Sequence, residues 1–186
     1  YLTAQGKLQS EGFVATVMSN LGLHKFCEEN HLKLLCAAVG DRNVLELMQK
    51  ESMVLGGEQS GHIIFLEHMT TGDGQLAALQ FLSILGQSGK KASELAGQIT
   101  HYPQLLQNVK VGSNEEKTAI LNSTELSMIV AREEKKLAGH GRILLRASGT
   151  EPLIRVMAEA DTQDLAELVV KTLVQAVENI QKILNK

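Results

Sequence analysis

The chain lacks several features that would assign it to a specialised class of protein. Among its 186 residues there is no tryptophan and only 3% are aromatic, so base-stacking platforms for single-stranded nucleic acid are not expected. No apolar run approaches the roughly 20 residues that cross a bilayer, and no basic segment followed by an apolar one opens the chain. Cys27 and Cys36 are too few for a disulfide framework and predict a reducing, cytoplasmic compartment.

The charge and the apolar content are those of an ordinary globular protein. Eighteen lysines and arginines against 21 acidic residues give a net charge of −3, which argues against partners such as nucleic acid or an anionic membrane. Hydrophobic residues make up 44% of the chain, enough for one large core or two small ones. The chain begins at Tyr1 rather than at a methionine, and residues 1–7 look like the tail of a longer element, so we expect a piece of a longer protein.

The first hundred residues alternate short apolar runs with helical patterns. Strands are predicted at 13–18 and 32–39, and helices at 21–30, 43–50 and 75–85. This alternation is typical of βαβ units around a parallel sheet. Two more apolar runs flank a glycine-rich turn within residues 54–66, and Gly86 is the expected stop of the third helix.

The pattern changes after a linker at 101–104, where Pro103 biases Tyr102 away from helix. Strands are predicted at 106–111, 142–146 and 153–159, and helices at 123–137 and 162–184. We therefore predict an α/β protein of two domains. Residues 1–103 form a mixed or parallel sheet with flanking helices, and residues 104–186 form a small α+β domain whose sheet is covered by two helices.

The strongest candidate for chemistry is the turn at residues 146–152, Arg-Ala-Ser-Gly-Thr-Glu-Pro. The guanidinium groups of Arg146 and of Arg155 on the next strand can each pair two phosphate oxygens. Ser148 and Thr150 add hydroxyl groups, and Gly149 permits a close approach of the backbone. These residues predict an anion-binding loop, and the competing interpretation is a polar hairpin with surface arginines.

A second candidate is the glycine-rich turn at residues 56–62. Glu58 can accept two hydroxyl donors and Ser60 can both donate and accept, so together they suit the vicinal hydroxyls of a sugar. His62 can move a proton or contact a phosphate, although a lone histidine beside an apolar strand is more often structural.

A third candidate is the Gly-Asp-Arg segment at 40–42, which follows the carboxyl end of a predicted strand, where ligands gather in open parallel sheets. Arg42 can reach a phosphate there, whereas the simpler role for Asp41 is to cap the following helix.

These segments together resemble the α-D-phosphohexomutase superfamily, in detail its bacterial phosphoglucosamine mutase branch. The resemblance rests on residues 16–20, 39–42, 56–64, 71–74 and 146–152, which occur in the family's order. It covers essentially the whole chain and implies the third and fourth domains of a four-domain enzyme. It also implies that the catalytic phosphoserine and the Mg²⁺ site lie in the first two domains, outside this chain, and that this chain alone is inactive.

The resemblance further implies a reaction and a role for each candidate residue. The enzyme would interconvert glucosamine 6-phosphate and glucosamine 1-phosphate through a phosphoserine and a bisphosphate intermediate, feeding UDP-N-acetylglucosamine and cell-wall synthesis. The phosphosugar is the expected partner. Glu58 and Ser60 would hold its hydroxyls, and His62 and Arg42 would lie near the reacting end. The phosphate that is not reacting would be held by Arg146, Ser148, Gly149, Thr150 and Arg155. A hinge near Pro103 would close the last domain over the substrate.

Three alternatives stay open. The sugar could instead be that of a phosphomannomutase or a phosphoglucomutase, although Gln59 favours the glucosamine branch over relatives that have methionine there. The chain could be a non-catalytic phosphosugar-binding or interaction module. An edge strand left exposed by truncation could also pair with a second copy and give a homodimer.

Overall fold

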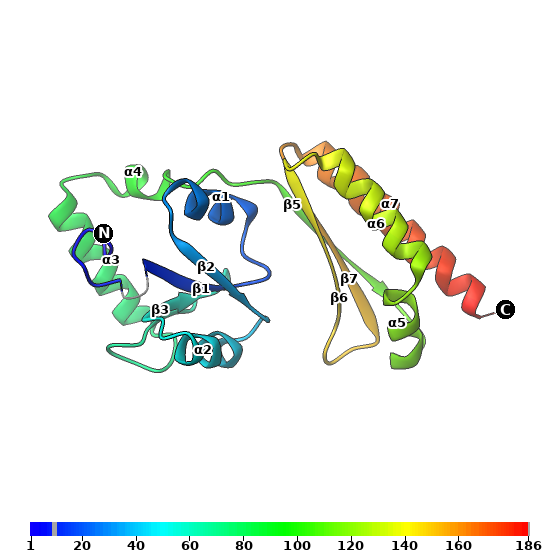
Figure 1. The fold of residues 1–186 in the computed structure, drawn as a ribbon, viewed down its shortest axis with the longest axis horizontal. Helices are drawn as coiled ribbons and strands as arrows, with labels where there is room; N and C mark the ends of the chain where they lie inside the picture. The colour runs from blue at the N-terminus through cyan, green and yellow to red at the C-terminus, as the bar shows by residue number, and fades with distance from the viewer. Residues whose placement is uncertain (9–10, 186) are drawn as a thin grey trace. The chain divides into compact units, whose positions relative to one another are not determined.

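The protein is described by a computed structural model over residues 1–8 and 11–185. It divides into two compact units, Tyr1–His101 and Tyr102–Lys186 (Figure 1). Within the described ranges, no helix has both the length and the apolar character needed to cross a membrane.

The first unit is built on a mixed sheet with the strand order β2-β1-β3-β4. Its elements are β1 Gly12–Thr16, α1 Leu21–Glu29, β2 Lys33–Ala37, α2 Asp41–Lys50, β3 Leu55–Gly57, β4 Ile63–Phe65, α3 Gly74–Ser88 and α4 Ala92–Ala96. The strand β1 pairs in parallel with β2 and β3, and β4 closes an antiparallel hairpin with β3. The predicted mixed sheet with flanking helices is confirmed, and its first two strands end sooner than predicted because residues 17–18 and 38–39 enter the turns before the helices.

The two faces of this sheet are filled to different extents. On one face Val14 and Ile64 pack against Val44 and Met48 of α2 in a closed core. On the other face Phe13, Leu55 and Ile63 line two apolar pockets of about 470 and 370 Å³. The helix α2 therefore fixes one side of the sheet firmly, while the opposite side is loosely filled.

The predicted stop of α3 at Gly86 is wrong. The helix continues to Ser88 and ends at Gly89, which has the left-handed φ of 64° that a helix-terminating glycine adopts. A glycine inside a helix weakens it without breaking it. The next glycine along the chain therefore ends α3.

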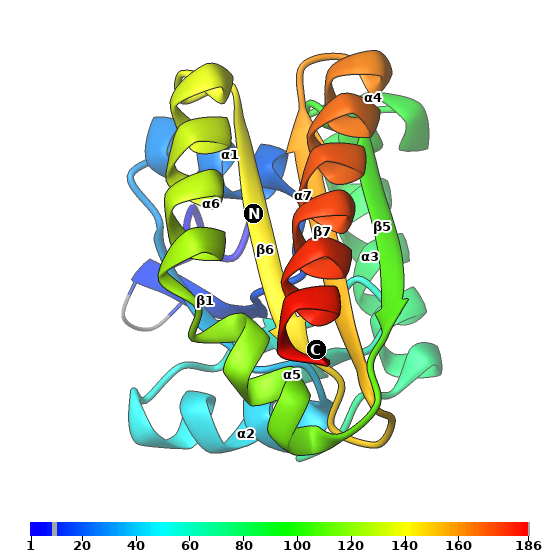
Figure 2. The same cartoon turned by 90° about the vertical axis from the view of Figure 1, so that its right-hand side faces the viewer.

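The second unit is an antiparallel sheet of order β5-β7-β6 with helices packed on it (Figure 2). Its elements are β5 Gln104–Lys110, α5 Asn114–Leu121, α6 Thr124–Leu137, β6 Gly141–Ala147, β7 Leu153–Ala160 and α7 Gln163–Leu184. The helices α6 and α7 lie side by side along the sheet, as the sequence predicted. The short helix α5 is an addition to the predicted pair, and it packs against α7 and β6.

Alternation along β7 separates the core of this unit from the arginines of the predicted anion-binding loop. Ile154, Val156 and Ala158 are fully buried in the cluster that α7 closes. Because successive residues of a strand point to opposite faces, Arg155 lies on the face away from that cluster. The apolar residues of β6 that pack on the cluster, Ile143 and Leu145, place Arg146 on the same opposite face.

Candidate functional site

In the first unit the predicted sugar-binding turn is the loop of the β3–β4 hairpin. The backbone N–H of Glu58 donates to the carbonyl of His62 at 3.0 Å, and the N–H of Gly61 donates to the carbonyl of Glu58 at 3.1 Å. Gly61 has a φ of 99°, which a residue with a side chain rarely adopts. The glycine therefore allows the tight turn that brings Glu58, Ser60 and His62 together.

The carboxylate of Glu58 is held on both oxygens. The Ser60 hydroxyl donates to Oε1 at 2.8 Å, and the backbone N–H of Gly40, before α2, donates to Oε2 at 3.3 Å. Only 11% of the Glu58 side chain is exposed. An acidic group beside the first turn of a helix is stabilised by the helix dipole. The hairpin loop and the start of α2 thus fix a carboxylate in one orientation.

His62 faces the same helix start. Its Nδ1 lies 2.8 Å from Oδ1 of Asp41 and 3.6 Å from Oε1 of Glu58. The hydrogen bond that the ring donates to Asp41, the charge of Asp41 and the weaker effect of Glu58 raise the pKa of His62 above its ordinary value, and desolvation opposes them. The imidazole therefore keeps its proton to higher pH than a free histidine, and Nε2 is the ring nitrogen outside these contacts.

Asp41 and Arg42 are the first two residues of α2. Gly40, the N-cap of that helix, offers no side chain for a cap, and the Asp41 carboxylate contacts His62. Arg42 pairs with Glu46 one turn further along the helix at 2.8 Å, with 90% of its side chain exposed. Sequence reasoning gave Asp41 a capping role, and the structure places it in contact with His62 instead.

Asp41, Glu58 and His62 place three potential metal ligands within 4.8 Å of one another. Mg²⁺ prefers six oxygen ligands in octahedral geometry and keeps several waters. The imidazole nitrogen, and the engagement of both Glu58 oxygens within the chain, suit that preference poorly. These three residues by themselves therefore do not make a complete magnesium site.

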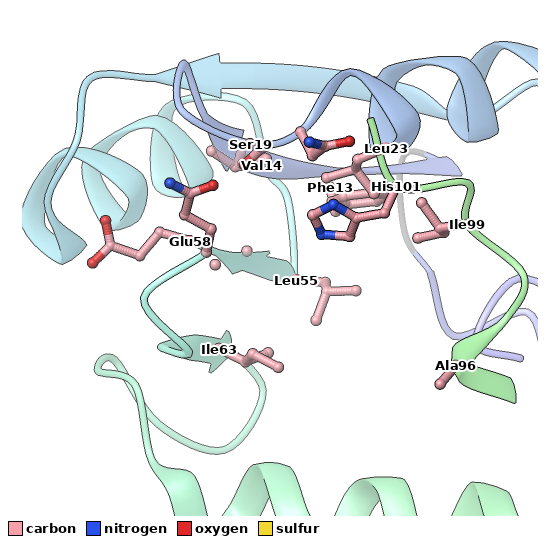
Figure 3. Close-up of a pocket in the computed structure, with 15 residues that line it drawn as sticks. Phe13, Val14, Ser19, Leu23, Leu55, Glu58, Ile63, Ala96, Ile99 and His101 are labelled. Carbon is pink, nitrogen blue, oxygen red and sulfur yellow. The ribbon is translucent and has the colours of Figure 1, made fainter. Parts of the chain in front are cut away.

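The larger of the two apolar pockets adjoins this group. Figure 3 shows Leu55, Ile99 and His101 around it, with the carboxylate of Glu58 pointing away from the His101 ring. Glu58 and Gln59, the first residues of the hairpin loop, are among the residues that line it. The start of the loop thus borders the pocket.

In the second unit the two arginines of the predicted phosphate loop lie directly opposite each other. Arg146 of β6 is the register partner of Arg155 of β7. Paired residues of adjacent strands have Cβ atoms about 4.5–5.5 Å apart, so the two guanidinium groups share one small region. The Nε atoms of both are buried without a hydrogen-bond partner within the described residues. Burial and the neighbouring charge of Arg155 lower the pKa of Arg146.

The turn between these strands is held by its own backbone and by Ser148. The N–H of Ser148 donates to the carbonyl of Leu153 at 3.0 Å, and its buried hydroxyl accepts from the N–H of Glu151 at 3.3 Å. Gly149 and Thr150 are exposed at the tip. A Cβ added at Gly149 would meet no heavy atom within 4 Å, so packing within the chain does not demand glycine there.

Sequence reasoning missed Lys117, which supports this turn from α5. Its Nζ donates to the carbonyl of Ser148 at 2.7 Å and to that of Glu151 at 3.3 Å. The helix itself had a detectable signal, since Ser113 accepts from the N–H of Glu116 and the Glu116 carboxylate accepts from the N–H of Gly112. Ser-x-x-Glu is the capping-box pattern of a helix start. The burial of Lys117 had no signal in the sequence.

Comparison with known proteins assigns both units. Residues 1–102 match the model of "Phosphoglucomutase/phosphomannomutase, alpha/beta/alpha domain III", and residues 106–176 match that of the "Phosphoglucomutase/phosphomannomutase, C-terminal domain". The chain belongs to the phosphoglucomutase/phosphomannomutase family. Glu58, Ser60 and His62 fall in its domain III, and the arginine pair falls in its C-terminal domain.

Among curated members of this family, the chain is similar to a phosphoglucosamine mutase of Lactococcus lactis subsp. cremoris. The two are 50% identical over 178 residues, 96% of this chain and 39% of the relative. A phosphoglucosamine mutase of Limosilactobacillus fermentum is 53% identical over 88% of this chain and 36% of its own length. The chain thus spans well under half the length of the curated relatives it matches.

Solved structures show the same fold. The N-acetylphosphoglucosamine mutase of Aspergillus fumigatus matches with a TM-score of 0.76 at 22% identity, over 91% of this chain and 38% of that one. Another structure of the A. fumigatus enzyme, in complex with GlcNAc-6P and magnesium, matches with a TM-score of 0.73 at 19% identity, over 97% and 41% of the two chains. The α/β fold of domain III followed by the C-terminal domain, predicted from the sequence, is therefore confirmed.

Proposed function

We propose that this chain is the substrate-binding half of a longer phosphoglucosamine mutase, which interconverts glucosamine 6-phosphate and glucosamine 1-phosphate. The observation that carries the proposal is the arginine pair: Arg146 and Arg155 are register partners whose buried Nε atoms have no protein acceptor in the described residues. Two such cations destabilise the protein unless an anion lies between them. The curated relatives, which are phosphoglucosamine mutases, support the choice of a phosphosugar.

The second unit would hold the phosphate that is not reacting. Arg146 and Arg155 supply charge and paired N–H donors, and the Thr150 hydroxyl and the amides at Gly149 and Thr150 complete the donor set. The Ser148 hydroxyl already accepts a bond from Glu151, and its proton remains available to a ligand. A phosphate dianion has enough acceptor oxygens for all these donors.

The first unit would recognise the sugar. Glu58 and Ser60 are already joined by a hydrogen bond, and the Glu58 carboxylate is fixed by the N–H of Gly40. A carboxylate in a fixed orientation can accept bonds from two neighbouring hydroxyls of a hexose. Nε2 of His62 would donate to or accept from the reacting end, and the exposed Arg42 would contribute a longer-range positive charge.

The bond-forming chemistry would use groups outside this chain. A phosphoserine would transfer its phosphoryl group to the free hydroxyl of the sugar phosphate, giving a bisphosphate and a free serine. After the sugar turns over, the serine would take back the other phosphoryl group. Mg²⁺, bound outside this chain, would stabilise the transferring group. Phosphoryl transfer depends mostly on positioning and electrostatic stabilisation, so a site that only holds the substrate contributes directly to the rate.

The proposal is tested by titrating the 186-residue chain with glucosamine 6-phosphate while recording ¹⁵N NMR spectra. We expect amide shifts at residues 146–155 and, separately, at residues 57–62. Glucosamine without phosphate should move only the second group, and inorganic phosphate only the first. Shifts that avoid residues 146–155 in the presence of either phosphate compound would contradict the proposal.

Two activity measurements complete the test. The chain alone should not convert glucosamine 6-phosphate, and magnesium-dependent turnover by the chain would show that its catalytic serine lies within these residues. For the full-length parent, kcat/KM should be higher for glucosamine phosphate than for glucose or mannose phosphate. A preference for one of the other two sugars would assign it to another branch of the family.

A further inference from the structure

The most unusual charged group outside the proposed contacts is the ammonium of Lys117 in α5. Lysine is rarely buried, yet Lys117 is only 7% exposed. Its two hydrogen bonds go to backbone carbonyls, at 2.7 Å to Ser148 and 3.3 Å to Glu151. Among the described residues it takes part in no ion pair.

The acidic residue beside it is directed elsewhere. The carboxylate of Glu116 accepts bonds from the N–H of Gly112, from Asn185 at 2.7 Å and from Gln181 at 3.5 Å. The positive charge of Lys117 is therefore not cancelled by its neighbour. A buried cation is costly, so its retention beneath this loop calls for a physical explanation.

An anion-binding loop must turn its carbonyl groups away from the anion, because a carbonyl oxygen repels a phosphate oxygen. The loop at 146–152 has carbonyls at Ser148 and Glu151 on either side of its exposed tip, Gly149 and Thr150. Lys117 binds both carbonyls at once. That contact fixes them on the α5 side and keeps the amides of the tip free for an outside acceptor.

We propose that Lys117 is a positioning residue for phosphate binding, which holds the carbonyls of Ser148 and Glu151 beneath the loop and adds an uncancelled positive charge behind it. This inference rests on the proposed phosphate role of residues 146–155. Lys117 does not itself touch the phosphate.

The experiment measures the dissociation constant of inorganic phosphate for the 186-residue chain by NMR, for the wild type and three variants. Lys117→Met removes the ammonium but keeps an unbranched side chain of similar length that tolerates burial. Lys171→Met removes the same charge from an exposed position on α7 of the same unit. Ile120→Ala opens a cavity at a fully buried residue one turn along α5 from Lys117 and leaves the ammonium in place.

We expect Lys117→Met to raise the dissociation constant for phosphate roughly tenfold. This is about the effect of losing one charge-assisted hydrogen bond. Lys171→Met and Ile120→Ala should stay within about twofold of the wild type. Phosphate binding by Lys117→Met within twofold of the wild type would overturn the inference and leave the proposed function standing. Equal weakening by Ile120→Ala would also overturn it, because the effect would then be one of helix stability alone.

A measurement on the wild type covers the outcome in which Lys117→Met does not fold. The ¹⁵Nζ resonance of Lys117 should shift during the phosphate titration with the same midpoint as the Gly149 amide. A Lys117 resonance that stays fixed while the Gly149 amide moves would overturn the inference. If neither moves and residues 146–155 show no binding, both the inference and the proposed function are wrong.

Discussion

Replacing Arg146 with methionine should weaken phosphate binding and make the second unit slightly more stable. The guanidinium of Arg146 stands opposite that of Arg155, and its Nε is buried without an acceptor. Burial and the charge of Arg155 already lower the pKa of Arg146, which shows that its environment disfavours the cation. Methionine keeps the aliphatic part of the side chain and removes the charge.

The magnitudes follow from this geometry. Loss of a charge-assisted hydrogen bond is worth about 1.5–3 kcal/mol, so the dissociation constant for phosphate should rise roughly 10- to 150-fold. Like charges on paired residues of neighbouring strands cost a few tenths to about 1 kcal/mol. The free energy of unfolding of Arg146→Met should therefore rise by up to about that amount, which for a domain of this size raises the melting temperature by a few degrees.

The assay is phosphate titration by NMR together with thermal unfolding of the same samples. Lys171→Met, which removes a positive charge from an exposed site in the same unit, is the matched control and should change neither quantity appreciably. The reasoning is refuted if Arg146→Met binds phosphate as the wild type does. It is also refuted if the variant loses more than about 1 kcal/mol of stability, because the arginine would then serve the fold.

Three further predictions concern other residues. Gly149→Ala should have the melting temperature of the wild type, because a Cβ there meets no heavy atom within 4 Å. It should bind phosphate more weakly, because the methyl group obstructs the approach of the ligand. Unchanged phosphate affinity would contradict a close approach at this position. Asp41→Asn should lower the pKa of His62 towards the ordinary histidine value of about 6.5, since the hydrogen bond that His62 donates to Asp41 is the largest cause of its increase; equal pKa values in an NMR titration would exclude that cause. Burial raises the pKa of Cys27 to about 11, so iodoacetamide at neutral pH should alkylate the exposed Cys36 and spare Cys27. Mass spectrometry of the peptides checks this, and alkylation of Cys27 before Cys36 would contradict it.

The sequence predicted the elements that carry strong local signals. The strand–helix alternation of the first unit and the long apolar stripe of α7 are set by residues within one element, and the structure confirms both. The missed helix α5 carries a weaker signal, a capping box over only eight helical residues. The stop of α3 was misplaced because a glycine at a helix end and one inside a helix look alike in the sequence.

The sequence indicated most residues of the candidate site, but it did not indicate which residues contact one another. Glu58 and Ser60 lie two residues apart, so one turn brings them together. Asp41 meets His62 across 21 residues and Lys117 meets Ser148 across 31, and both contacts depend on tertiary packing. Sequence reasoning gave Asp41 only a capping role and did not single out Lys117, although each contacts a residue of the candidate site. Supporting residues of this kind lack a motif of their own, because their role is defined only by what they contact.

The sheet of the second unit also contains an arginine that is paired with a carboxylate, which can be compared with the arginine pair. On the same two strands, Arg142 of β6 is the register partner of Glu159 of β7, and its Nε lies 2.5 Å from the Glu159 carboxylate. Gln104 of β5 donates to the other oxygen of that buried carboxylate at 2.7 Å. Four residues along β6, the equivalent pairing joins Arg146 to Arg155, and the acceptor is missing from the protein within the described residues. The same scaffold thus supplies a carboxylate to one arginine and leaves two others facing each other, which makes physical sense if an anion from outside the protein takes the place of the carboxylate.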